Sequence, residues 1–198
     1  MMVVKDKDKD SYEVLILLSG GVDSTSLVQY HLSNGEKVAA IFFDYGQASC
    51  EREYQSARAI SEHYDIQLQR VKLGFPIKNQ EGEFFCRNAL FVLAACSFLD
   101  RTVSFISLGI HSETPYYDST PAFVDDAQSI LDGYFGGVIR IIAPFLNYSK
   151  ERLYEYALQE QVPVYLTYSC ETGQNEPCGK CLSCIDRRML DGKSSRED

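Results

Sequence analysis

The stretch that decides the fold is VLILLSGGVDS, residues 14–24. It begins with an unbroken apolar run, Val14 to Leu18, which is typical of a strand buried on both faces of a parallel sheet. Ser19-Gly20-Gly21 interrupts the run, and a helical pattern follows from Ser24 to Ser33 before Asn34-Gly35 ends it. A buried strand that passes through a glycine turn directly into a helix indicates the first unit of an α/β fold.

Strands and helices continue to alternate outward from this unit. We predict further strands at 38–43, 66–73, 103–108 and 138–143, and helices at 51–64, 89–99, 121–131 and 149–159, the last capped by Ser149. The polar segment 74–83 is predicted to be a loop that covers a site. The alternation predicts a doubly wound parallel sheet, with ligands bound beyond the carboxyl ends of its strands. That rule places Ser19–Asp23, Asp44–Gln47 and Ile110–Glu113 along one crevice.

Composition narrows the class of protein. With 198 residues, of which 45% are hydrophobic, the chain can bury one sizeable core. Its net charge of -9 argues against direct binding of nucleic acid, because phosphate contacts need a positive face. No apolar run is long enough to cross a membrane, and Met1 to Asp10 is charged where a signal peptide would be apolar. We therefore expect a cytoplasmic protein that acts on a small molecule or on another protein.

The glycine turn Ser19–Ser24 has the chemistry of a phosphate cradle. Glycines let several backbone N–H groups approach one anion, and the helix that follows adds the partial positive charge of its N-terminus. The turn lacks the Gly-Lys-Ser/Thr end of a Walker loop and the spacing of a dinucleotide fingerprint. The alternative is an ordinary glycine turn capped by Ser24. Asp23 and the paired hydroxyls, placed between strand and helix, favour phosphate binding.

Four of the seven cysteines predict a metal site near the C-terminus. They are Cys170, Cys178, Cys181 and Cys184. Four thiolates complete the tetrahedral shell of Zn²⁺ and leave no position for water, which indicates a structural zinc ion. A [4Fe–4S] cluster and a group of free thiols are the alternatives. The other three cysteines, Cys50, Cys86 and Cys96, are interpreted as small core or loop residues.

The phosphate motif, of the form SGGxDS, resembles that of the PP-loop ATP pyrophosphatases. The resemblance implies that ATP is split between its α and β phosphates, that an adenylate forms, and that a nucleophile then displaces AMP. It also implies that Mg²⁺ offsets the charge of the leaving pyrophosphate. By resemblance the phosphate-binding residues are Ser19, Gly20, Gly21, Asp23 and Ser24, assisted by Thr25.

Three further segments are similar to the 7-cyano-7-deazaguanine synthase (QueC) family. They are Phe43-Asp44-Tyr45-Gly46-Gln47, Arg87-Asn88 and Cys178-Gly179-Lys180-Cys181-x2-Cys184-x2-Arg187, and the resemblance runs from Glu13 to about Met189. It implies that ATP activates the carboxylate of 7-carboxy-7-deazaguanine, that ammonia gives an amide, and that dehydration gives a nitrile on the route to queuosine. It also implies a homodimer.

The resemblance assigns expected roles to single residues. Asp44 and Tyr45 are expected to contact the nucleotide, the alternative being a loop turn. Arg87 is expected to hold a carboxylate or phosphate in a fork and to take part in catalysis, beside Asn88 as a substrate contact. The other expected substrate contacts are His111 and Asp118, and the other expected catalytic residues are Asp23, Ser24 and Glu113. For His111 and Glu113 a solvated loop position is the alternative.

Two departures from the family pattern concern the acceptor substrate. Tyr117-Asp118-Ser119-Thr120 stands where the family has Pro-Asp-Cys-Arg, so a cation is missing, and Gly74 to Phe85 replaces a longer loop. A more open crevice admits a larger acceptor, such as a protein.

The sequence therefore predicts four parts. They are a disordered tail at 1–12, an ATP-binding α/β domain of the PP-loop type at 13–165, a zinc-binding module packed on it at 166–190 and a disordered tail at 191–198. The leading function is an ATP-dependent ligase for a carboxylated 7-deazaguanine and ammonia. The alternatives are a related enzyme that joins a 7-deazaguanine to a protein amine, for example in a defence system, a PP-loop tRNA-modifying enzyme, and an inactive binding module stabilised by zinc.

Overall fold

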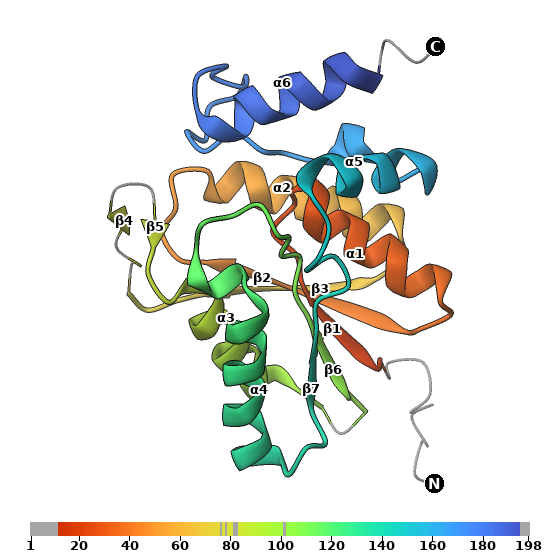
Figure 1. Ribbon diagram of the computed structural model, residues 1–198, viewed down its shortest axis with the longest axis vertical. Helices are drawn as coiled ribbons and strands as arrows, with labels where there is room; N and C mark the ends of the chain where they lie inside the picture. The colour runs from red at the N-terminus through yellow and green to blue at the C-terminus, as the bar shows by residue number, and fades with distance from the viewer. Residues whose placement is uncertain (1–11, 76, 78, 81–82, 101, 195–198) are drawn as a thin grey trace, which may run out of the picture.

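A five-stranded parallel sheet forms the centre of the molecule (Figure 1). The computed structural model describes residues 12–75, 77, 79–80, 83–100 and 102–194. The strands of the sheet are β1 (Val14–Leu17), β2 (Val38–Asp44), β3 (Gln67–Lys72), β6 (Phe105–Ser107) and β7 (Arg140–Ile142). Their order is β3-β2-β1-β6-β7, and every neighbouring pair is parallel. The predicted doubly wound α/β fold is confirmed.

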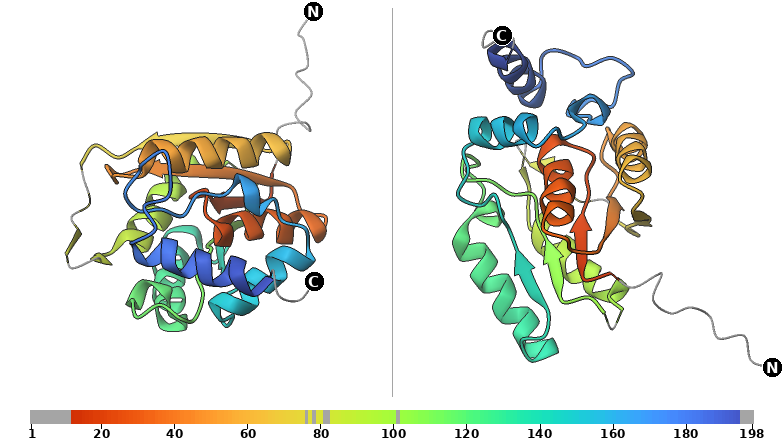
Figure 2. Two further views of the ribbon diagram at one scale, coloured as in Figure 1. Left: turned by 90° about the horizontal axis from the view of Figure 1, so that it is seen from above. Right: turned by 90° about the vertical axis from the view of Figure 1, so that its right-hand side faces the viewer.

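Helices cover both faces of the sheet. They are α1 (Val22–Ser33), α2 (Cys50–His63), α3 (Arg87–Ala95), α4 (Pro121–Phe135), α5 (Lys150–Gln159) and α6 (Leu182–Ser194). One core cluster joins the sheet to α1, α2 and α5, and the other joins it to α3 and α4. Helix α6 lies outside these layers, above α5 (Figure 2). No helix in the part of the chain that the structure describes is long and apolar enough to span a membrane.

Strand β1 occupies the centre of the sheet and contributes to both cores. Val14, Ile16 and Leu18 pack with α1, α2 and α5, whereas Leu15 packs with α3 and α4. This alternation explains why the strand is apolar at every position. The chain winds from β1 toward β3 and later returns to the other side of β1 as β6. Ligands bind at such a reversal in open α/β sheets, which directs attention to the carboxyl ends of β1 and β6.

Several elements differ from the expected ranges. The predicted loop at 74–83 contains a short antiparallel pair, β4 (Asn79–Gln80) and β5 (Glu83–Phe84). Helix α4 continues to Phe135 and ends where Gly136 adopts a φ of 60°. Helix α6 continues to Ser194, into the segment for which the sequence predicts a tail, while 1–11 and 195–198 lie outside the described residues. The predicted cap is confirmed, since Ser149 Oγ accepts a hydrogen bond from Arg152 N at 3.1 Å.

Candidate functional site

A pocket of about 280 Å³ opens beyond the carboxyl ends of β1, β2 and β6. Its walls come from the ends of these strands, from the phosphate loop 19–24, and from the first turns of α2 and α3. Among the predicted site residues, those that line the pocket are Ser19, Asp23, Ser24, Tyr45, Arg87, Asn88 and His111. The structure therefore gathers these residues from four separate segments of the chain around one cavity.

Close packing fixes the path of the phosphate loop. Gly20 has a φ of 84°, and a Cβ atom there would lie 2.6 Å from the carbonyl oxygen of Glu53 on α2. A glycine is thus required by both the backbone conformation and the space. Gly109, after β6, is also close, because a Cβ there would lie 3.1 Å from Ser24 N. The loop is enclosed by α2 on one side and by the end of β6 on another.

Hydroxyl groups brace the loop from within. Ser24 Oγ donates to the carbonyl oxygen of Gly21 at 3.2 Å, and Thr25 Oγ1 donates to the same oxygen at 2.7 Å. Ser19 N donates to Ser24 Oγ at 3.2 Å. Thr25 is fully buried and does not line the pocket. Its contacts favour a role in holding the start of α1, while Ser19 and Ser24 face the site.

Asp23 places a carboxylate at the edge of this loop. Its side chain is 33% exposed, and His111 Nε2 lies 3.8 Å from its Oδ2 atom. Burial raises the pKa of Asp23, and the nearby charges of His111 and Lys150 act in the opposite direction. A carboxylate that protein groups solvate poorly is well suited to bind a divalent cation that arrives with a phosphate.

An aromatic wall and a guanidinium group form the other end of the pocket. Phe43 and Phe91 stack with their ring centres 4.8 Å apart and their planes 14° apart, and Tyr45 lies 5.3 Å from Phe91. The guanidinium of Arg87 lies 5.9 Å from the ring centre of Phe84. Burial raises the pKa of Tyr45, and the positive charge of Arg87 opposes this effect. A planar, anionic molecule fits the chemistry of this end.

Asp118 lies behind Asn88. Asp118 Oδ2 accepts a hydrogen bond from Asn88 N at 3.1 Å, and its carbonyl oxygen accepts one from Asn88 Nδ2 at 2.8 Å. Asp118 does not line the pocket. Its carboxylate satisfies a free N–H at the start of α3 and orients Asn88. These contacts favour a supporting role for Asp118 in place of the predicted direct contact with substrate.

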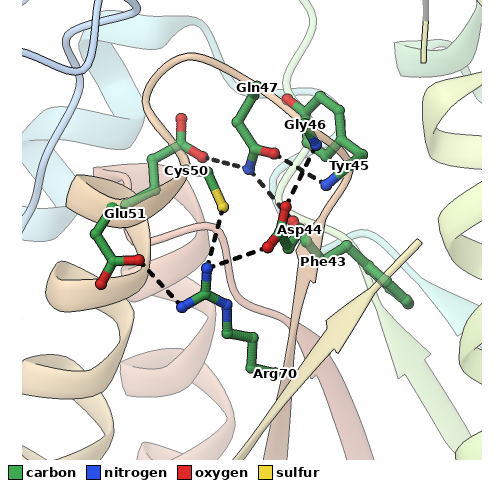
Figure 3. A network of polar contacts seen from close by, with 9 residues as sticks. Phe43, Asp44, Tyr45, Gly46, Gln47, Cys50, Glu51 and Arg70 are labelled. Carbon is green, nitrogen blue, oxygen red and sulfur yellow. Dashed lines mark hydrogen bonds and ion pairs between the residues drawn. The ribbon is translucent and has the colours of Figure 1, made fainter. Parts of the chain in front are cut away.

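Asp44 turns toward Arg70 on β3 (Figure 3). Its Oδ2 atom lies 3.1 Å from the Arg70 guanidinium, and its Oδ1 atom accepts a hydrogen bond from Gly46 N at 3.3 Å. Burial alone would raise the pKa of Asp44. Hydrogen bonds from Cys50 and Arg70 more than offset this effect and hold that pKa below its usual value. Asp44 does not line the pocket, so its contacts favour the loop-turn alternative over the nucleotide contact.

Gln47, which the sequence placed in the crevice without a role, and Glu53, which it did not place there, also line the pocket. Gln47 Nε2 donates to Glu53 Oε2 at 2.9 Å, and Gln47 Oε1 accepts from Tyr45 N at 3.0 Å. The other carboxylate oxygen of Glu53 accepts from Ser49 Oγ at 2.6 Å. The pair fixes the turn that presents Tyr45. An acidic residue in the first turn of a helix that follows a strand end is the signal in the sequence that points to Glu53.

His111 and Glu113 have different surroundings. His111 is buried and lines the pocket, and its Nδ1 atom accepts a hydrogen bond from Glu113 N at 3.3 Å. Glu113 is exposed, and its carboxylate accepts a hydrogen bond from Lys150 N at 2.9 Å, at the start of α5. The Glu113 side chain therefore stabilises a helix N-terminus. Of this pair, the geometry favours His111 as the group that meets a ligand.

The four predicted ligand cysteines converge at one point. Their sulfur atoms all lie within 4.8 Å of one another, an arrangement able to hold a metal ion. Cys178 N donates to Cys170 Sγ at 3.3 Å, and the N–H groups of Lys180 and Cys181 donate to Cys178 Sγ at 3.4 Å. Although burial would raise it, hydrogen bonds from Cys178 and Thr172 lower the pKa of Cys170 to about 5, and those from Lys180 and Cys181 lower the pKa of Cys178. Burial raises the pKa of Cys184 to about 12, so metal binding has to release a proton there.

Known proteins resemble the chain over most of its length. A family model described as "Queuosine biosynthesis protein QueC" matches residues 13–81 and 78–190. The 7-cyano-7-deazaguanine synthase of Aquifex aeolicus (strain VF5) is 30% identical and aligns with 88% of this chain and 94% of its own. That of Prochlorococcus marinus (strain MIT 9312) is 29% identical, with 92% of each chain aligned. A predicted subunit of tRNA methyltransferase from Methanocaldococcus jannaschii, at 14% identity, has a TM-score of 0.52 over 74% of both chains, which supports the fold alone.

Proposed function

Because the chain belongs to the QueC family, we propose that it is an ATP-dependent ligase that converts 7-carboxy-7-deazaguanine to 7-cyano-7-deazaguanine. In the proposed reaction the carboxylate attacks the α-phosphate of ATP, and pyrophosphate leaves. Ammonia then displaces AMP from the adenylate to give the amide. A second ATP adenylates the amide oxygen, which leaves with AMP as the nitrile forms. The protein supplies position and charge for these steps.

One observation carries the proposal: the phosphate loop and Arg87 open into the same pocket. An acid held by the Arg87 guanidinium can therefore lie beside the α-phosphate of a nucleotide held by the loop. The aromatic wall at the Arg87 end suits the flat ring system of a deazaguanine. We assign the pyrophosphate to the loop N–H groups, with Ser19 and Ser24, and the substrate acid to Arg87 and Asn88.

Charged groups at the loop have separate tasks in this proposal. Asp23 is the residue that would hold Mg²⁺, which offsets the charge of the leaving pyrophosphate. His111 lies 3.8 Å from Asp23 and lines the pocket, so it can keep a proton near the phosphates or orient ammonia. The residues that would hold Zn²⁺ are the four converging cysteines, and a shell of four thiolates gives this ion a structural task.

Product analysis tests the proposal. The protein is incubated with ATP, Mg²⁺, ammonium chloride and 7-carboxy-7-deazaguanine, and the products are identified by mass spectrometry. We expect 7-cyano-7-deazaguanine, AMP and pyrophosphate. When ammonia is left out, we expect label to exchange between pyrophosphate and ATP only in the presence of 7-carboxy-7-deazaguanine. Exchange that yields a product only when a protein amine is added would favour the conjugating alternative. Absence of acid-dependent exchange would contradict the proposal.

A further inference from the structure

The peptide that joins Gly20 to Gly21 is anchored from outside the phosphate loop. The carbonyl oxygen of Gly20 accepts a hydrogen bond from Tyr168 N at 2.9 Å and lies 2.8 Å from Ser56 Oγ on α2, a donor that it shares with the carbonyl oxygen of Leu166. Ser56 is buried, and neither donor lines the pocket. Two contacts therefore hold this carbonyl toward α2 and the segment after α5.

Peptide geometry converts this anchor into an orientation for Gly21 N–H. In a planar trans peptide, the C=O of one residue and the N–H of the next point in opposite directions. With the Gly20 carbonyl held toward α2, the Gly21 N–H points to the opposite side of the loop. Its protein acceptor there, Ser19 Oγ, is 3.5 Å away, at the outer limit of a hydrogen bond. The N–H is left available to a stronger acceptor such as a phosphate oxygen.

Two successive glycines make such an anchor necessary. Glycine adopts positive and negative φ with similar ease, and Gly20 has a φ of 84°. The peptide between two glycines can therefore rotate at little cost when nothing holds it. A rotated peptide would present the Gly20 carbonyl oxygen to the phosphates in place of the Gly21 N–H, and two negative groups would meet.

Ser56 also connects the loop to the segment that enters the four-cysteine module. Its hydroxyl lies within hydrogen-bonding distance of the carbonyl oxygen of Leu166 as well as that of Gly20, and it donates its one hydrogen to either of them. Tyr168, the second anchor, lies two residues before Cys170. The chain that starts the module thus passes directly behind the phosphate loop, where Figure 2 shows it crossing above α1 and α2.

The module also packs tightly against the turn after β2 and the start of α2. A Cβ atom at Gly173 would lie 2.1 Å from the carbonyl oxygen of Ala48, in the turn that follows β2. Arg52 on α2 donates to the carbonyl oxygen of Asn175 at 3.0 Å. These contacts limit the movement of the segment that carries Tyr168.

We infer that Ser56 is a positioning residue that aims the Gly21 N–H at the nucleotide phosphates, together with the Tyr168 N–H at the entrance to the four-cysteine module. The inference rests on the proposed function only in assigning phosphates to this loop. Ser56 acts through the Gly20–Gly21 peptide and touches no substrate itself.

Binding of magnesium pyrophosphate to the full chain, measured by calorimetry, tests the inference. Ser56→Ala is compared with Ser61→Ala, because Ser61 is equally buried on the same helix but donates to Arg58 O within that helix. We expect Ser56→Ala to weaken pyrophosphate binding about tenfold, the effect of impairing one hydrogen bond to a charged group, and Ser61→Ala to leave it unchanged. Binding of the carboxylated substrate in the absence of nucleotide should be the same in all three proteins, which a general structural defect would not allow.

Other results of the calorimetry would overturn the inference alone or the proposed function with it. Equal pyrophosphate affinity in the two variants would overturn the inference and leave the proposed function intact. Failure of the unsubstituted protein to bind pyrophosphate would overturn both. If Ser56→Ala does not fold, Ser56→Cys keeps the size of the side chain with a weaker donor. It should give a smaller loss of affinity, and unchanged affinity would again overturn the inference.

Discussion

His31 on α1 is joined to Ser107 on β6 across the interior, with 2.8 Å between Nε2 and Oγ. The other ring nitrogen lies 2.6 Å from Glu36 Oε2. This Glu-His-Ser arrangement has the spacing of a catalytic relay, yet His31 is 1% exposed, Ser107 is fully buried, and neither lines the pocket. The contact holds the first helix to the sheet on which the phosphate loop is built.

Ser107→Ala should therefore destabilise the fold without altering ligand binding. Removing the hydroxyl leaves a buried ring nitrogen without its partner, which costs about 1–3 kcal/mol in the free energy of unfolding. Urea denaturation measures this loss. Ser33→Ala is the control. Ser33 lies on α1, as His31 does, but it is exposed, so its substitution should change the free energy of unfolding by less than about 0.5 kcal/mol. Equal stability of the two variants would contradict the structural role of the pair.

Asp23→Asn should abolish ATP consumption and at the same time stabilise the protein at neutral pH. Burial raises the pKa of Asp23 in the folded protein, so its ionisation opposes folding increasingly as the pH rises above the pKa of the unfolded chain, and in full above the folded pKa. Asn carries no such charge, and we expect a melting temperature higher by roughly 2–4 °C at pH 7, the shift that about 1 kcal/mol produces in a domain of this size. The difference should shrink as the pH falls and should vanish below about 4, where Asp23 becomes protonated in both the folded and the unfolded state. Near-normal pyrophosphate release by the variant would argue against the proposed site.

Cys181→Ser should remove the metal ion and destabilise the four-cysteine module. Elemental analysis is expected to find about one zinc ion per chain in the unsubstituted protein and much less in the variant. Cys96→Ser is the matched control, because Cys96 lies outside the cluster and donates to Val92 O at 3.3 Å. Iron together with visible absorption, or no metal in protein purified without chelator, would rule out the zinc assignment.

Arg87→Gln should weaken the use of the carboxylated substrate more than the use of ATP. Losing a hydrogen bond to a charged group costs about 1.5–3 kcal/mol, which predicts a rise of more than about tenfold in KM for the acid. The KM for ATP should change little, because the phosphate loop is built from other segments. Arg140→Gln on β7, an exposed residue 3.7 Å from Asp132, is the control. A rise confined to the KM for ATP would place Arg87 at the nucleotide instead.

Thr120 stands where the family has an arginine, and the structure gives this threonine a role of its own. The family comparison suggests Thr120→Arg as a way to restore recognition of the free acid. In the structure, Thr120 Oγ1 accepts a hydrogen bond from Phe123 N at 3.2 Å and caps α4, and Thr120 does not line the pocket. The substitution should therefore cost about 0.5–2 kcal/mol of stability through loss of the cap. Arg87 is better placed to receive the acid.

Backbone features followed closely from the sequence because they depend on neighbours in the chain. The apolar run in β1, the glycine turn after it and the Ser149 cap are all local patterns, and they predicted the sheet, the crevice and a helix start. The spacing of the cysteines predicted the four-cysteine cluster equally well, because four cysteines within 15 residues of chain can meet at one point in only a few ways.

Side-chain directions in the site were harder to predict, because they depend on residues distant in the chain. Asp44 turns to Arg70, Glu113 to the backbone of Lys150, and Asp118 to Asn88. The sequence placed Asp44 and Glu113 after strand ends, and the family resemblance added Asp118 as a substrate contact. Nothing in the local pattern indicates which partner takes each carboxylate, so a direct ligand contact was expected where the structure has a supporting one.

Polar contacts join helix α6 to α5, and one apolar side chain of the helix, Leu190, packs against the core beneath it. Its acidic residues Asp186 and Asp191 meet Lys150 and the hydroxyl of Tyr154 on α5. Three of its apolar side chains, Leu182, Ile185 and Met189, are exposed. Salt screens such charged contacts far more than it affects the apolar layers beneath. At high ionic strength α6 should become sensitive to proteases while the sheet remains resistant, and the metal ion would then be what keeps the C-terminal segment attached.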